Sequence, residues 1–226
     1  MISQFPPPDV ARPDGLLAIG GDLSSDTLIA AYSQGIFPWF NEGQPILWWS
    51  PDPRLVLFPN RLRISKSLRK NLKNKGYLIL FDDKFGAVMR ACAEQRENQD
   101  GTWINPLMLE AYDEMHRQGW AHSVEVFNGD GQLVGGLYGI SIGKVFFGES
   151  MFHRERDVSK IALFALCRHL QAWGYTVIDC QVHTDHLVSL GAEEIPRSSF
   201  CELLHTHCRD LGPSGKWRVE PGLLHI

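Results

Sequence analysis

The chain has 226 residues, of which 44% are hydrophobic and 21% charged, and a formal net charge of −4 at pH 7. This length allows one sizeable core, or one domain with a smaller appendage, and the composition is that of a globular protein. No run of ~18 consecutive apolar residues is present, which excludes an ordinary transmembrane helix. The first residues lack the features of a signal peptide, and the five cysteines form no C-x-x-C pair, so we expect a cytoplasmic protein.

Residues 1–55 are rich in glycine, proline and tryptophan and predict a small, irregular N-terminal domain. Either Ser24 or Ser25 is placed to cap one short helix, which ends at Gly35. The remaining residues, 56–226, are expected to form the second domain.

A basic segment opens this second part. Between Pro53 and Phe81 there is no acidic residue, whereas 8 of the 22 lysines and arginines fall there. A helix beginning at Ser65 would place four of them on one side, namely Lys66, Arg69, Lys70 and Lys73. Such an asymmetry steers a polyanion to one place, although an ordinary solvated helix face would look the same.

Two more helices and a strand are predicted before the middle of the chain. A short strand is expected over Tyr77–Phe81, and Asp82 or Asp83 is placed to cap the helix after it. Pro106 suits the first turn of the next helix, which ends at Gly119.

The C-terminal half of the chain has the sequence patterns of several β-strands and one long helix. Asn128–Gly131 has the composition of a hairpin turn, and three strands are predicted over residues 122–127, 132–141 and 144–151. Asp157 is placed to cap an apolar helix over Val158–Trp173, and a strand over Tyr175–Val182 follows it. This order predicts an α+β fold with a mixed sheet and packed helices.

Three polar residues on two predicted strands are candidates for catalysis. Asp179 and Gln181 should share one face of their strand, where an acid and an amide can hold an incoming amine in line with an acyl carbon. Capping and backbone hydrogen bonds are the alternative use of this pair. Glu149 interrupts an apolar strand, and because burying a carboxylate is costly, it requires a cationic ligand group or a neighbouring Arg or Lys.

Glycines and histidines predict no cofactor site. Gly135, Gly136 and Gly139 lie within a strand pair rather than at a strand-to-helix turn, so they predict a bulge or close backbone approach by a ligand and not a dinucleotide loop. Neither metal nor other cofactor is expected, because two histidine clusters lack the spacing of a zinc site: His183-x-x-His186 and His205-x-His207-Cys208.

Four tryptophans, Trp39, Trp48, Trp49 and Trp103, occupy loop-like segments on both sides of the basic helix. Aromatic rings beside basic residues hold single-stranded RNA ends by stacking, although a tryptophan-rich domain interface would use the same residues.

Seven short segments occur in a fixed order: Gly15–Leu23, Gly35–Phe40, Trp48–Arg54, Gly101–Ile104, Gly148–Phe152, Ile178–Gln181 and Ser189–Arg197. Together they closely resemble the leucyl/phenylalanyl-tRNA–protein transferase family. The resemblance implies a C-terminal domain similar to the GCN5-related N-acetyltransferase fold, with aminoacyl-tRNA in place of acetyl-CoA. It implies transfer of Leu or Phe, and less well Met, to proteins that begin with Arg or Lys, by a monomer without a membrane partner. The product is marked for degradation under the bacterial N-end rule.

The resemblance also implies site residues. Trp39 and Trp103 would sandwich the 3′-terminal adenosine, and the basic helix would follow the tRNA acceptor strand. The apolar side chain of the donor would contact Leu137, Phe146, Gly148, Met151, Leu163, Leu166, Leu170 and Ile178. For catalysis, our hypothesis is that Gln181 holds the amine or its proton, Asp179 polarises that relay, and Glu149 orients the amine or the aminoacyl group.

Two other functions fit parts of the sequence. A CoA-dependent N-acetyltransferase usually opens its core helix with a glycine-rich turn, whereas His153–Asp157 precedes the helix here. An RNA-binding module without catalysis leaves the apolar pocket and the pair Asp179 and Gln181 unexplained.

Overall fold

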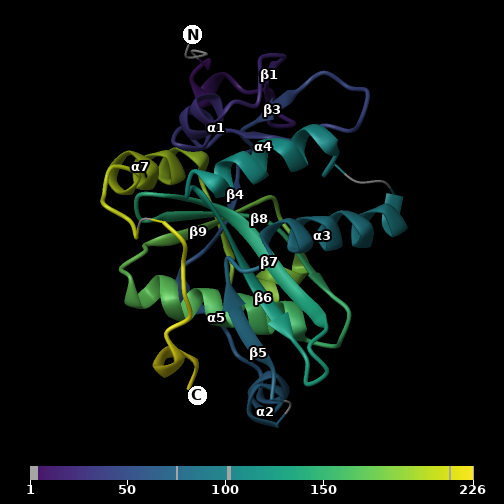
Figure 1. The fold of residues 1–226 in the computed structure, drawn as a ribbon. Coiled ribbons are helices and arrows are strands. Elements are labelled where there is room, and N and C mark those ends of the chain that lie inside the picture. Colours follow the sequence, from purple (N-terminus) through teal and green to yellow (C-terminus); the bar gives the residue numbers. More distant parts are fainter. Residues whose placement is uncertain (1–4, 75, 101–102, 214, 226) are drawn as a thin grey trace.

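The structure is a computed structural model that describes residues 5–74, 76–100, 103–213 and 215–225. A small antiparallel sheet of order β1-β3-β2 lies at the N-terminal end (Figure 1), built from β1 (Leu16–Ile19), β2 (Phe37–Pro38) and β3 (Leu47–Trp49). Helix α1 (Ser25–Tyr32) packs beside it. The Ser24 hydroxyl accepts the Thr27 backbone N–H, which decides between the two predicted caps.

The larger sheet has seven strands in the order β10-β4-β9-β8-β7-β6-β5. Neighbouring strands are antiparallel except β8 and β9, which run parallel because helix α5 (Val158–Ala172) connects them. The strands are β4 (Arg54–Leu57), β5 (Leu78–Phe81), β6 (Ala121–Phe127), β7 (Leu133–Ile142), β8 (Val145–His153), β9 (Val177–Gln181) and β10 (Glu193–Ile195). The predicted α+β class, with its mixed sheet and packed helices, is confirmed.

Helices cover both faces of this sheet (Figure 1). Because side chains alternate along a strand, Phe146 packs in the cluster formed with α5, whereas Phe147 packs in the cluster formed with α1, α3 (Phe85–Asp100) and α4 (Pro106–Arg117). This second cluster joins Tyr32 of α1 to Tyr112 of α4, so the small sheet and the large one share a buried core. The domain boundary at residue 55 stays a prediction.

The predicted cap of α5 by Asp157 is wrong, and so is Asp82 as the cap of α3, whereas Asp83, the alternative for α3, stays a prediction. Asp157 occupies the N-cap position of α5, but its backbone is left-handed (φ 67°) and its carboxylate accepts from Lys160 Nζ at 2.8 Å instead of from the helix. A capping residue is normally extended, which aims its side chain at the first turn. Asp82 also has a positive φ, and its carboxylate accepts the backbone N–H groups of Ser123 and Trp217.

The strand glycines allow the protein's own chain to approach closely. A Cβ on Gly139 would lie 2.6 Å from the Phe146 ring, and one on Gly135 would lie 2.5 Å from Val158. Gly139 also follows the β-bulge between β7 and β8. The predicted bulge is therefore present, and packed side chains occupy the space that these glycines leave.

The remaining helices lie at the edges of the large sheet, and they are α2 (Lys66–Asn74), α6 (Asp185–Ser189) and α7 (Arg197–His207), with short 3-10 turns at Pro8–Val10, Pro59–Arg61 and Pro221–Leu224. Among the residues described, no helix is both long and apolar enough to cross a membrane.

Candidate active site

A cavity of about 400 Å³ lies where the segment after β2 meets β8, β9 and α5. This volume is within the range of small-molecule sites. Seven of the eight residues predicted for the aminoacyl pocket line it, namely Leu137, Phe146, Gly148, Met151, Leu163, Leu166 and Ile178. The eighth, Leu170, is fully buried in the core beneath α5 and does not line the cavity, because it lies one helical turn beyond Leu166.

Trp39 and Trp103 line the same cavity although 64 positions separate them in the sequence. Trp39 is 43% exposed, and its backbone carbonyl accepts the indole N–H of Trp49 at 2.7 Å. Two indole rings on one cavity, one of them open to solvent, provide flat surfaces on which a base can stack.

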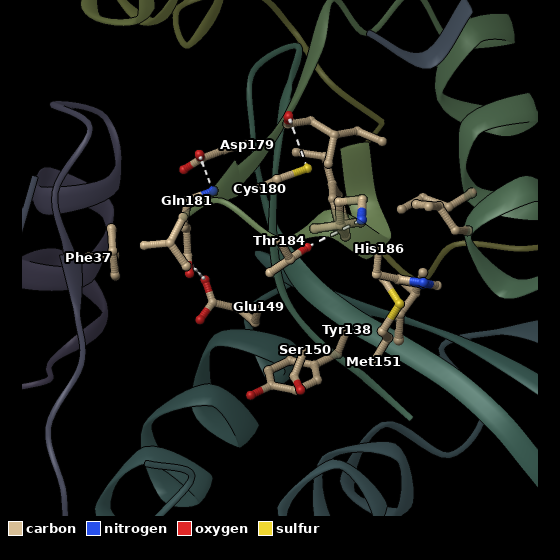
Figure 2. Close-up of a pocket in the computed structure, with 18 of the residues that line it drawn as sticks. Phe37, Tyr138, Glu149, Ser150, Met151, Asp179, Cys180, Gln181, Thr184 and His186 are labelled. Atoms are coloured by element: carbon tan, nitrogen blue, oxygen red, sulfur yellow. Dashed lines mark hydrogen bonds between the residues drawn. The ribbon is translucent and has the colours of Figure 1, made fainter. Parts of the chain in front are cut away.

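Glu149 is buried at the edge of this cavity, with 7% of its surface exposed. Its carboxylate accepts from the Tyr32 hydroxyl at 2.7 Å, the Tyr112 hydroxyl at 3.2 Å and the Gln181 side-chain amide at 3.0 Å. In Figure 2 the side chains of Glu149 and Gln181 point toward one another. The expectation of a neighbouring Arg or Lys fails within the described residues, where neutral donors hold the carboxylate.

Burial raises the pKa of Glu149 to about 7, against the lowering effect of these hydrogen bonds. The Tyr32 and Tyr112 hydroxyls also contact each other. The site can thus hold or release one proton near neutral pH.

Asp179 is fully buried and makes a bidentate ion pair with Arg54, whose Nε and Nη2 lie 2.8 and 2.6 Å from its two carboxylate oxygens. Asp179 also accepts the backbone N–H of Gln181 at 2.9 Å. Gln181 has a positive φ of 64°, which turns the end of β9 and directs its side chain to Glu149. Asp179 and Gln181 do lie together, but the hydrogen bond between them uses the backbone of Gln181 (Figure 2).

The predicted basic helix is α2, on which Lys66, Arg69 and Lys70 are exposed. The side chain of Lys73 falls outside the described residues. Contacts between α2 and α5 fix the helix on the body of the protein, and the Asn71 amide donates to Asp157 at 3.4 Å.

Sequence reasoning missed three residues of the site. The sequence assigned no chemical role to Tyr32, Tyr112 or Arg54. Tyr32 and Tyr112 carry no pattern that separates them from core aromatics. Arg54 did carry a signal, because it ends the motif Trp48–Arg54 and is the one charged residue of the otherwise apolar strand β4.

A mainly apolar cavity with a buried, titratable carboxylate at its edge is typical of an enzyme active site. Comparison with known proteins agrees with this class. The profile of the leucyl/phenylalanyl-tRNA protein transferase family matches residues 56–205, and that of the N-terminal domain of these transferases matches residues 21–52. The chain therefore belongs to the leucyl/phenylalanyl-tRNA–protein transferase family and is a transferase.

Individual relatives are similar along nearly their whole length. The transferase of Chromobacterium violaceum is 56% identical over 215 residues, which cover 94% of this chain and 92% of that protein. The transferase of Nitrosomonas eutropha is 57% identical over 218 residues, 96% and 93% of the two chains. A solved GCN5-related N-acetyltransferase from Kribbella flavida is far more distant, with 15% identity and a TM-score of 0.33 over 72% of this chain and 58% of its own.

Proposed function

We propose that this enzyme transfers leucine or phenylalanine, and less efficiently methionine, from aminoacyl-tRNA to the α-amino group of proteins that begin with Arg or Lys. The observation that carries this proposal is a single cavity that joins an apolar floor to the hydrogen-bonded pair Glu149 and Gln181. The relatives are named for the same donors. The product would carry a destabilising N-terminus under the bacterial N-end rule, and the enzyme would act as a cytoplasmic monomer.

The cavity accommodates the acylated end of a tRNA in two parts. The rings of Trp39 and Trp103 take the 3′-terminal adenosine between them. The leucine or phenylalanine side chain enters the apolar part, where Phe146, Leu166 and Ile178 line the wall. The ester that joins the amino acid to the ribose of the adenosine then lies between the two parts of the cavity, close to Glu149.

The reaction is aminolysis of an activated ester. The neutral α-amine of the acceptor attacks the ester carbonyl carbon, a C–N bond forms, and the C–O bond to the ribose breaks. The amine loses a proton and the leaving ribose oxygen gains one, so no external oxidant or cofactor is required. Because an α-amino group has a pKa near ~8, it is partly neutral at pH 7, and positioning supplies much of the acceleration.

Three side chains share the positioning and proton transfer in this proposal. Gln181 holds the attacking amine through its amide oxygen, since its NH₂ group is engaged by Glu149. Glu149 takes up the proton, because its pKa of about 7 is close to that of the amine. Asp179 acts as a positioning residue that fixes the turn at Gln181 through the backbone N–H.

The surface of α2 supplies the longer-range attraction. Lys66, Arg69, Lys70 and Lys73 would contact successive phosphates of the acceptor strand without reading its sequence. This proposal places a basic surface on a protein whose net charge is −4.

A CoA-dependent N-acetyltransferase is disfavoured by the start of α5. Acetyl-CoA binding of that kind uses the free N–H groups of a helix N-terminus to hold a pyrophosphate. Here the segment His153–Asp157, which contains no glycine, precedes the helix in place of a glycine-rich turn.

The test incubates the protein with radiolabelled Leu-tRNA or Phe-tRNA and a protein that begins with Arg. Matched acceptors begin with Met or have an acetylated N-terminal Arg, and labelled acetyl-CoA replaces the tRNA in a parallel reaction. Label on the free Arg acceptor alone is expected. Label from acetyl-CoA only, or no label on any acceptor, would overturn the proposal.

A further inference from the structure

The last part of the chain, residues 215–225, is here called the C-terminal strap. It follows α7 and lies beyond the residues that match the family profile. Figure 1 shows it passing from α7 across α5, and its final 3-10 turn contacts that helix. The strap therefore packs against α5, whose Leu163 and Leu166 line the cavity.

Hydrogen bonds fix the strap at several points. The Trp217 backbone N–H donates to Asp82 at 2.7 Å, and the Glu220 N–H donates to His169 Nε2 at 2.8 Å. The Glu220 carboxylate accepts the indole N–H of Trp173 at 2.6 Å. Arg168 donates to the Leu223 carbonyl at 3.1 Å. These hydrogen bonds fix the strap against the body of the protein, and Trp217 is the one residue of the described strap that is buried.

Trp217 is the deepest residue of the strap, with 2% of its surface exposed. Its ring stacks on His122 at 3.8 Å between centroids with an interplanar angle of 6°. The centroid of the Phe146 ring lies 5.9 Å from it. The indole N–H has no hydrogen-bond partner among the described residues, so position 217 contributes the bulk of a large ring and not a donor.

Phe146 connects the strap to the cavity. One part of its ring lines the cavity wall. The ring occupies the space over Gly139, where a Cβ would come within 2.6 Å of it, and Trp217 contacts it from the strap. Since packed interiors leave few voids, the ring cannot retreat from the cavity while both neighbours are in place.

We propose that Trp217 is a specificity-determining residue, which acts by positioning Phe146 and so limits the depth of the aminoacyl pocket. The inference rests on the proposed function, because it assumes that the cavity takes the donor side chain. With a smaller residue at position 217, Phe146 can move back, and the pocket deepens. A phenylalanine donor then gains more than a leucine donor, because its larger side chain fills the added space.

The experiment measures kcat/KM for transfer from Phe-tRNA and from Leu-tRNA to a protein that begins with Arg. Trp217→Ala is expected to raise the ratio of Phe to Leu transfer by about tenfold, the usual effect of a small change in pocket size. Trp217→Phe, which keeps a ring, is expected to shift the ratio less in the same direction. Arg168→Ala loosens the end of the strap without touching Trp217 and should leave the ratio unchanged.

The outcomes separate the two proposals. Wild-type protein that transfers neither amino acid overturns the proposed function and this inference with it. An active wild type with an unchanged ratio in the folded Trp217 variants overturns the inference alone. If Trp217→Ala does not fold, an unchanged ratio in Trp217→Phe has the same meaning. A shift in Arg168→Ala as large as that in the Trp217 variants also overturns it, since general loosening would then be the cause.

Discussion

Two buried carboxylates lie at opposite ends of Gln181 and are held in different ways. Asp179 faces the guanidinium of Arg54 in a fully buried ion pair. Glu149 faces two tyrosine hydroxyls and one amide, all of them neutral. The partner of Asp179 is thus a cation, whereas Glu149 is desolvated among neutral donors and can exchange a proton near pH 7.

The difference assigns separate tasks to the two groups. Asp179 holds the turn at Gln181 by accepting the backbone N–H of that residue. Glu149 offers a proton-exchanging group beside the cavity, with a pKa of about 7. Asp179 is therefore suited to hold Gln181 in place, and Glu149 is suited to proton transfer.

Breaking the ion pair is expected to have the largest effect. Arg54→Met leaves Asp179 charged, buried and unpaired, and we expect a loss of about 3–5 kcal/mol in the free energy of unfolding. Urea denaturation measures it. The double variant Arg54→Met with Asp179→Leu removes both charges and should recover most of the loss. If Arg54→Met is as stable as the wild type, loss of the cation beside buried Asp179 does not lower the free energy of unfolding, and the prediction is wrong.

The second prediction concerns the pH dependence of stability. The pKa of Glu149 is about 7 in the folded protein, whereas the ordinary pKa of a glutamate is 4.5. Between these values the unfolded chain has lost a proton that the folded protein keeps, so stability falls as pH rises through this window. The contribution present below pH 4.5 is about 3 kcal/mol and is lost by about pH 7.

Glu149→Gln removes this titration. Unfolding free energies measured from pH 4 to pH 8 should decline less steeply in the variant, while transfer activity falls by about 10²-fold. Burial also raises the pKa of Glu125, but that residue is present in both proteins, so the difference between them isolates Glu149. Parallel pH curves for the two proteins would contradict the prediction.

The smallest expected effect concerns the tyrosines. Tyr32→Phe removes a hydroxyl that stabilises ionised Glu149, so the pKa of Glu149 should rise further, by about one pH unit. The acid limb of the pH profile of transfer should move to higher pH by the same amount. Tyr112→Phe should shift it less, because its hydrogen bond is longer, 3.2 Å against 2.7 Å. An unmoved profile in both variants would remove Glu149 as the titrating group.

Much of the secondary structure followed from the sequence alone. The helix over Val158–Ala172 and the hairpin around Asn128–Gly131 arise from local periodicity and turn chemistry, which act over a few residues. Ordered motifs identified the family, and they drew attention to Glu149, Asp179 and Gln181, all of which line the cavity. Caps were less predictable, because Asp82 and Asp157 make their hydrogen bonds with other groups.

Only the tertiary structure determined the partners of the Glu149 and Asp179 carboxylates, and with them the tasks that each can perform. Tyr32 lies 117 positions from Glu149, and Arg54 lies 125 positions from Asp179, so no local pattern connects either pair. A pKa depends on desolvation and on the charges that folding brings near, neither of which a local pattern shows. Strand alternation placed Asp179 and Gln181 on one face but did not predict the turn at Gln181. Trp217 illustrates the same limit: the sequence shows a tryptophan near the end of the chain, and the fold places it behind Phe146.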